Sequence, residues 1–218
     1  MWQLLLVQGK RVGKPGLEIV TFGCSYTYGE GLPDVKKHFI SGNPQNTSKL
    51  GWATLVSQKL KLDLVNISYP GTSNTEILYN ILTFNFKADD IVVVMWTHPI
   101  RDIMFDKWTR FNSFRTRLGF WKKESNTAWE KQVDIKDYVI KTWMCIHHVD
   151  LLLKVKKIKY IHYPQDISEY NDYVIKEIKI DNLHNDGFLK VDKVADGHPG
   201  VESNRLTAEN IFRILNEK

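Results

Sequence analysis

The sequence predicts an α/β fold, a three-layer α/β/α sandwich around a flavodoxin-like, doubly wound and mainly parallel sheet of about five strands. Four short runs are rich in β-branched residues and apolar through most of their length, as in parallel strands covered on both faces. Segments with helical periodicity lie between them, and this alternation is typical of a parallel sheet. With 218 residues and no evident linker, residues 1–218 are expected to form a single domain.

The predicted strands are Leu17–Phe22, Leu62–Ile67, Ile91–Trp96 and Ile158–His162. Two helices are predicted from apolar stripes that begin at Trp52 and Ile77. A third is predicted over Asp137–Lys154, and a fourth carries Ala208, Ile211, Phe212 and Leu215. Right-handed crossovers place the loops that follow the strands along one edge of the sheet, where a functional site is expected.

Three regions depart from this pattern. Residues 31–49 are polar and rich in turn formers, which predicts a loop. Residues 105–131 alternate aromatic with basic side chains, which predicts an insertion that folds over the edge of the sheet as a lid. Residues 1–16 are interpreted as an extra edge strand or, in part, as a start-site artefact.

The composition excludes several classes of protein. A formal net charge of +5 is too weak to indicate the concentrated basic face of a nucleic-acid binder. The two cysteines, Cys24 and Cys145, form neither a disulfide framework nor a zinc motif. No window approaches the roughly 18 apolar residues of a membrane span. The apolar run Leu4–Val7 is too short for a signal peptide, so a cytoplasmic location is expected.

The stretch IVTFGCSYTYGEGL, from Ile19 to Leu32, leaves the first predicted strand through Gly23 and presents Ser25 just beyond it. At such an exit the sequence is either an ordinary turn or a device that exposes a nucleophile, and a serine nucleophile needs a base from elsewhere in the fold. Cys24 is expected to be a small buried packing residue, because consecutive residues at a strand exit point in different directions.

The best candidate for the base is His198 in the stretch ADGHPG. Asp196 lies two residues upstream, and Pro199 and Gly200 favour a defined turn. A carboxylate so close can hold one imidazole nitrogen and leave the other facing a serine. The remaining six histidines have no comparable local arrangement with a carboxylate.

A third group of polar residues follows the second predicted strand in YPGTSNTEI, Tyr69 to Ile77. Ser73 or Asn74 could cap the next helix. Gly71 permits close approach of the backbone to a ligand, and Asn74 carries a side-chain amide. These are the donors that an oxyanion hole requires.

The blocks FGCSYTYG, NISYPGTSNTEI and DGHPG resemble, in order, blocks of the SGNH/GDSL hydrolases. The resemblance extends from about Leu17 to the C-terminus and implies Ser25 as nucleophile, His198 as general base and Asp196 as its orienting carboxylate. It also implies the N–H groups of Ser25 and Gly71 as oxyanion donors. We expect Ser25 Oγ within roughly 2.6–3.2 Å of a His198 ring nitrogen.

The chain departs from this family at three places. Cys24 replaces the usual aspartate before the serine. The usual DxxH is DxH here, so Asp192 is an alternative to Asp196. The third block lacks its asparagine and reads VVVMWTHPIRDI, so the third oxyanion donor is expected to be Asn74 or, as a substitute, Thr97. Loss of one donor typically costs about 3 kcal/mol of transition-state stabilisation.

The resemblance implies a serine esterase that acts on ester-bearing small molecules or glycans, with carbohydrate O-deacetylation as a leading possibility and no cofactor or metal. Arg101, Trp108 and Trp121 are candidate substrate-binding residues, since aromatic rings stack on sugars and arginine binds carboxylates. Two alternatives stay open, namely a weak or inactive carbohydrate-binding or particle-assembly protein and an O-acyltransferase. Similar forms occur in bacterial surface-polysaccharide systems and in phages; a phage-encoded protein would be virion-associated or released.

Overall fold

The computed structural model describes residues 16–35, 48–99, 101–105, 113–117, 135–165, 180–184 and 186–217. In chain order, the elements are β1 (Glu18–Gly23), α1 (Ser25–Tyr28), α2 (Trp52–Leu60), β2 (Asp63–Ser68), α3 (Asn74–Thr83), β3 (Ile91–Trp96), β4 (Arg101–Phe105), β5 (Ser113–Arg117), α4 (Ile135–Val155), β6 (Lys159–Pro164) and α5 (Val201–Asn216).

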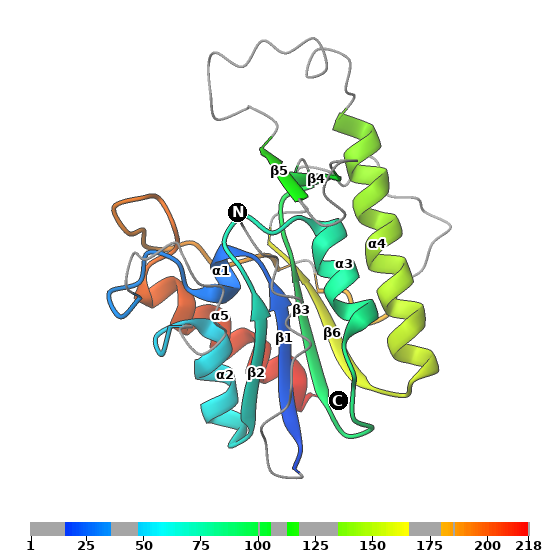
Figure 1. The fold of residues 1–218 in the computed structure, drawn as a ribbon. Helices are drawn as coiled ribbons and strands as arrows, with labels where there is room; N and C mark the ends of the chain where they lie inside the picture. Colours follow the sequence, from blue (N-terminus) through cyan, green and yellow to red (C-terminus); the bar gives the residue numbers. More distant parts are fainter. Residues whose placement is uncertain are drawn as a thin grey trace, which may run out of the picture.

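The main sheet is parallel and has the strand order β2-β1-β3-β6 (Figure 1). All four predicted strands are confirmed, each within two residues at its ends. In the described ranges the sheet has four strands where about five were expected. The central strand β1 pairs with both β2 and β3, so Val20 lies opposite Val65 on one side and Val92 on the other. The strand order therefore reverses beside β1, and ligands of such sheets bind at the carboxyl ends of the strands near this point.

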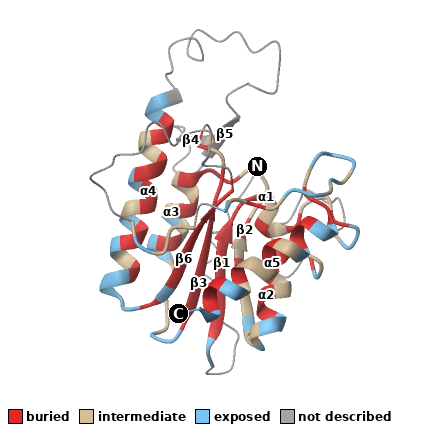
Figure 2. Cartoon of the chain, turned by 180° about the vertical axis from the view of Figure 1, so that it is seen from behind, coloured by how far each residue is buried: buried red, intermediate tan, exposed pale blue. Residues whose placement is uncertain are grey.

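Helices cover both faces of the sheet. Val20, Phe22 and Val94 pack with residues of α3 and α4, whereas Ile19 and Val93 pack with residues of α2 and α5. This alternation follows the period of two of a β-strand. Figure 2 shows the strands buried between helices whose outer surfaces are exposed. The predicted three-layer α/β/α architecture is thus confirmed.

The helices α3 and α5, which follow the loops predicted to carry site residues, begin in different ways. Ser73 caps α3, because its side chain accepts a hydrogen bond from the N–H of Glu76. Helix α5 has Gly200 at its N-cap and so has no capping side chain of its own. Asp192 supplies the missing acceptor, since its carboxylate binds the N–H of Glu202 at 3.1 Å and that of Ser203 at 2.7 Å.

Replacing Asp192 with alanine is expected to lower the free energy of unfolding by about 1 kcal/mol, the usual effect of losing a helix cap. The Ser203 hydrogen bond is the main reason that the pKa of Asp192 lies below its usual value. A lowered folded-state pKa stabilises the protein above the unfolded-state pKa of about 3.9, and this contribution is lost as the pH falls through the folded-state value. Urea denaturation of both proteins between about pH 7 and pH 3 should show the difference shrinking at acidic pH.

The control for this prediction is Asp89→Ala, at an exposed position with no hydrogen bond or ion pair in the described chain. Its effect should stay within about 0.5 kcal/mol. An Asp192 variant as stable as the wild type at neutral pH would contradict the capping role.

The predicted insertion is described only in part. It contains β5, which pairs antiparallel with β4 at the start of the insertion, so that Ile103 lies opposite Arg115. Trp108 and Trp121 lie outside the described residues, as do 36–47 of the predicted loop and 1–15 of the N-terminal segment. Among the described helices, none combines the length and the apolar character that a membrane crossing requires.

Candidate active site

Ser25 lies at the carboxyl end of β1 and is the first residue of α1. The exit from the strand needs a glycine, because a Cβ on Gly23 would lie 2.0 Å from Thr27 Oγ1. Ser25 is almost fully buried. Its backbone N–H lies at the N-terminal end of α1, and the first N–H groups of a helix have no acceptor within that helix. Ser25 therefore combines a hydroxyl with an adjacent N–H at the predicted edge of the sheet.

Cys24 is fully buried beside Ser25, as predicted. Its thiol donates a hydrogen bond to Gln165 Oε1 at 3.3 Å, which connects the exit of β1 to the end of β6. Ser25 Oγ lies 3.9 Å from Cys24 Sγ, a long O–H to sulfur contact. Cys24 thus fixes the backbone next to the serine.

His198 is held between two carboxylates. Its Nδ1 lies 3.0 Å from Asp196 Oδ1, and the same oxygen accepts the backbone N–H of His198 at 3.1 Å. Its Nε2 lies 3.1 Å from Glu30 Oε2, in the loop that follows α1. The ring also packs edge-on against Tyr26, with centroids 5.8 Å apart. The Asp196–His198 pair is therefore present and lies against the segment that carries Ser25.

The expected hydrogen bond between Ser25 and His198 is not formed in the described arrangement, because Nε2 contacts Glu30 instead. The hydrogen bond with Glu30 is the main reason that the pKa of His198 is raised, with a further contribution from Asp196, whereas burial of the ring acts in the opposite direction. A raised pKa favours the imidazolium, which cannot accept a proton. In this arrangement, Nε2 is therefore held by Glu30 and is not hydrogen-bonded to Ser25 Oγ.

The loop after α1 approaches Asp196 closely because Gly31 has no side chain. Gly31 has a φ of +85°, and a Cβ there would lie 2.6 Å from Val194 Cγ2 and 2.9 Å from Asp196 Oδ1. A turn in which the N–H of Gly197 binds the Val194 carbonyl, together with the bond from Val194 N–H to the His198 carbonyl, fixes the other side. The sequence motif GEGL thus places Glu30 against His198.

The glycine of the second block also has a special conformation. Gly71 has a φ of 79°, in the left-handed region that glycine adopts without strain. It lies within a turn in which Thr72 binds the Tyr69 carbonyl through both its N–H and its hydroxyl. Among the described residues, the N–H of Gly71 has no hydrogen-bond acceptor. Gly71 can therefore donate to a ligand.

Comparison with known proteins identifies this architecture. No protein-family model matches the sequence, and no curated protein matches it either. A solved carbohydrate esterase, whose active site is described as displaying divergent catalytic and non-catalytic binding functions, matches with a TM-score of 0.57 and 16% identity over 95% of this chain and 67% of that chain. An acetylxylan esterase from Geobacillus stearothermophilus, solved as a catalytic mutant, matches with a TM-score of 0.52 and 16% identity over 92% and 94%.

The chain has the SGNH hydrolase fold. An acetyl xylan esterase from the rumen bacterium Butyrivibrio proteoclasticus also shares it, with a TM-score of 0.54 and 12% identity over 94% of this chain and 64% of that chain. Identities this low establish the fold alone, so the roles of individual residues depend on the geometry of this chain.

The side chain of Asn74, a predicted oxyanion donor, is hydrogen-bonded within the protein. It is buried, and its amide nitrogen donates to the Thr97 carbonyl at 2.9 Å and to Thr142 Oγ1 at 3.1 Å. Its oxygen accepts the N–H of Thr97 at 2.9 Å. Both amide hydrogens are therefore used, and the predicted role of Asn74 as an oxyanion donor would require one of these bonds to break.

Thr97 follows β3 and is the other predicted donor. Its Oγ1 accepts a hydrogen bond from Arg101 Nη1 at 3.0 Å. Within the described chain, its hydroxyl hydrogen is not used in any hydrogen bond. Arg101 is half-buried at the start of β4, so its guanidinium is fixed at the end of β3. The Thr97 hydroxyl can therefore donate a hydrogen bond to a ligand, with Arg101 beside it.

Asp192 does not replace Asp196 as the partner of His198. The Asp192 carboxylate caps α5, and it occupies the space in which a Cβ of Gly200 would lie, 2.2 Å from Oδ2. The DxH spacing is therefore sufficient for a carboxylate to bind the His198 ring, because Asp196 reaches Nδ1 within a single turn of the chain.

His162 is not a competing base. It is fully buried in β6, where its Nδ1 accepts the indole N–H of Trp96 at 3.1 Å. Burial lowers its pKa to about 3, although the nearby Asp150 carboxylate acts in the opposite direction. His162 therefore stays neutral and packs the interface between the sheet and α4.

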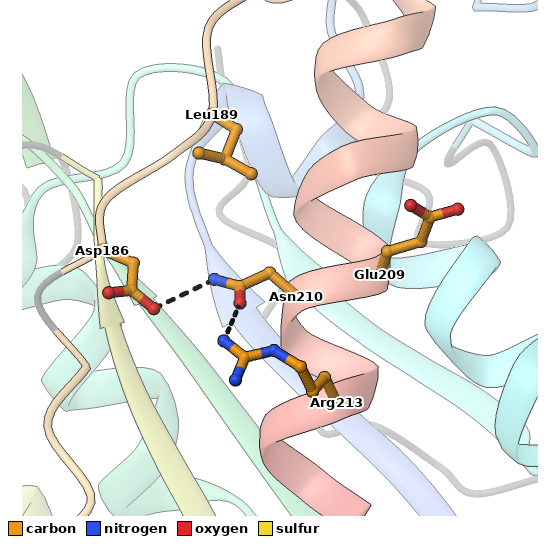
Figure 3. A pocket seen from close by; sticks show the side chains of 5 residues that line it. All are labelled: Asp186, Leu189, Glu209, Asn210 and Arg213. Atoms are coloured by element: carbon orange, nitrogen blue, oxygen red, sulfur yellow. Dashed lines mark hydrogen bonds between the residues drawn. The ribbon is translucent and has the colours of Figure 1, made fainter.

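A hollow of about 570 Å³ lies beside α5, and neither Ser25 nor His198 lines it (Figure 3). Its polar groups bind one another, since Asn210 donates to Asp186 and accepts from Arg213. The lining residues are Asp186, Leu189, Glu209, Asn210 and Arg213. This hollow does not extend the candidate site, and the described residues contain no cluster of His, Cys, Asp or Glu suited to a metal ion.

Proposed function

We propose that this protein is a serine esterase of the SGNH/GDSL type, with an O-acetyl group on a carbohydrate as its substrate. The proposal rests on one observation. The Asp196–His198 pair lies against α1, the helix that begins with Ser25, at the carboxyl end of β1, where open α/β sheets bind ligands. Two of the solved structures that share the fold are acetylxylan esterases, which favours a glycan ester as the substrate.

The reaction proceeds in two steps. His198 takes the proton of Ser25 Oγ as the oxygen attacks the ester carbonyl, and the N–H groups of Ser25 and Gly71 bind the developing oxyanion. His198 then protonates the leaving alcohol, and an acyl-serine remains. Water, deprotonated by the same imidazole, releases the acid and restores Ser25. Asp196 holds Nδ1 throughout and stabilises the imidazolium.

A second candidate is a glycan-binding or particle-assembly protein with little or no turnover. Two observations favour it, namely the contact of His198 Nε2 with Glu30 and the use of both Asn74 amide hydrogens within the protein. A third candidate transfers the acyl group from Ser25 to a sugar hydroxyl instead of water.

The test is release of acetate from p-nitrophenyl acetate and from acetylated xylan by the wild type and by His198→Ala. An esterase should release acetate from both substrates only when His198 is present. Release of nitrophenol with formation of a new sugar ester would indicate the transferase. Binding of xylan without release of acetate by the wild type would overturn the esterase and indicate the binding protein.

A further inference from the structure

The unexplained contact in the candidate site is the one between Glu30 and His198. Nε2 is the ring nitrogen that a serine hydrolase turns toward its nucleophile, because Nδ1 is bound by the orienting carboxylate. Here Nδ1 is bound by Asp196 and Nε2 by Glu30, at 3.0 Å and 3.1 Å. The two ring nitrogens are thus both occupied by carboxylates, and neither is available to Ser25.

The position of Glu30 is built into the chain. The N–H of Glu30 binds the Ser25 carbonyl at 2.9 Å, so the loop that carries Glu30 is anchored to the residue that carries the nucleophile. On its other side, Gly31 lies against Asp196 without a side chain between them. The Glu30 and His198 side chains are each about one-fifth exposed, with relative exposures of 19% and 21%, so the contact is at the mouth of the site.

Three described groups contact the His198 ring. The groups that face it are Asp196 from its own turn, Glu30 from the loop after α1 and the Tyr26 ring from α1. Lys190 is the charged group that contacts Tyr26 among the described residues, with Nζ 5.6 Å from the ring centroid. Among these, Glu30 contacts the catalytic nitrogen directly.

We propose that Glu30 is a positioning residue that holds Nε2 of His198 in a resting arrangement and must release it before His198 can take the proton of Ser25. The inference rests on the proposed esterase function. In the resting arrangement, the imidazolium donates Nε2–H to the Glu30 carboxylate. Release of the proton to solvent and rotation of the ring toward Ser25 Oγ give the neutral base. No other reactant is required.

The direct test is a titration of the His198 ring by heteronuclear NMR from about pH 5 to about pH 9, with the signal assigned by comparison with His198→Ala. The proteins are the full-length wild type, Glu30→Gln, which removes the charge at nearly constant size, and Glu30→Ala, which removes the contact. The control is Glu209→Gln, an exposed carboxylate of α5 that pairs with Arg205. Thermal melting of each variant checks the fold.

Both Glu30 variants should lower the midpoint of the His198 titration, while Glu209→Gln leaves it unchanged. At about pH 6, kcat/KM for p-nitrophenyl acetate should rise by about two- to fivefold in Glu30→Gln, the effect of losing a partly exposed ion pair. This gain should shrink at higher pH, where the ring is neutral in every variant.

The two hypotheses fail in different ways. An unchanged titration midpoint in both folded Glu30 variants, or a kcat/KM at pH 6 that falls instead of rising, would overturn the role of Glu30 even in an active esterase. If no variant hydrolyses the ester, the esterase function fails, and the titration still decides whether Glu30 holds His198.

Discussion

Replacing Ser25 with alanine is expected to lower kcat for ester hydrolysis by at least about 10⁴-fold, because both steps of the proposed reaction pass through Ser25 Oγ. The fold should be retained, since the lost hydroxyl makes only a long contact with Cys24 Sγ. The measurement is the initial rate with p-nitrophenyl acetate, together with a denaturation curve for each protein.

The matched control is Ser57→Ala, another buried serine, which lies on α2 and binds the Thr54 carbonyl. It should retain the wild-type rate within about twofold. The neighbouring thiol supplies a second control, because Cys24→Ala should remain active if the thiol serves only to hold Gln165. Wild-type rates in Ser25→Ala, or loss of activity only in Cys24→Ala, would assign the chemistry to another residue.

Replacing Asn74 with alanine is expected to lower the free energy of unfolding by about 3 kcal/mol or more. The substitution removes three hydrogen bonds and leaves the N–H and carbonyl of Thr97 and the hydroxyl of Thr142 without this partner. Each buried polar group that loses its partner costs about 1–3 kcal/mol. Urea denaturation of the wild type and the variant measures the difference.

The control is Asn80→Ala on the same helix, where the side chain has no hydrogen bond in the described chain, and its effect should stay within about 0.5 kcal/mol. The experiment also separates the two interpretations of Asn74. A large loss of stability supports the structural role seen here. A loss of kcat of about 10²-fold with stability nearly unchanged would instead support a donor in the oxyanion hole.

Local sequence patterns predicted the fold and one contact of the candidate site. The four strands are apolar runs whose neighbours along the chain are helical, so each was visible within a short window. The Asp196–His198 contact was also predictable, because it closes across two residues in a turn defined by Pro199 and Gly200. The burial of Cys24 followed from the direction of side chains at a strand exit.

The errors and omissions concern contacts between distant segments. Cys24 and Gln165 are 141 residues apart, and nothing near Gln165 indicates its partner. Glu30 was missed because its flanking glycines predict only a flexible loop, and its contact with His198 depends on how two loops pack. Asn74 carries the right chemistry for an oxyanion donor, but its amide turns inward to Thr97 because the end of β3 presents unpaired backbone groups there.

The most direct test of the central claim is to label the wild-type protein with a fluorophosphonate probe and to locate the adduct by mass spectrometry after proteolysis. Such probes phosphonylate a serine that a neighbouring base activates. We expect a single adduct on Ser25, absent from Ser25→Ala and strongly reduced in His198→Ala. An adduct on any other residue, or no adduct together with no hydrolysis of p-nitrophenyl acetate, would contradict Ser25 as the nucleophile.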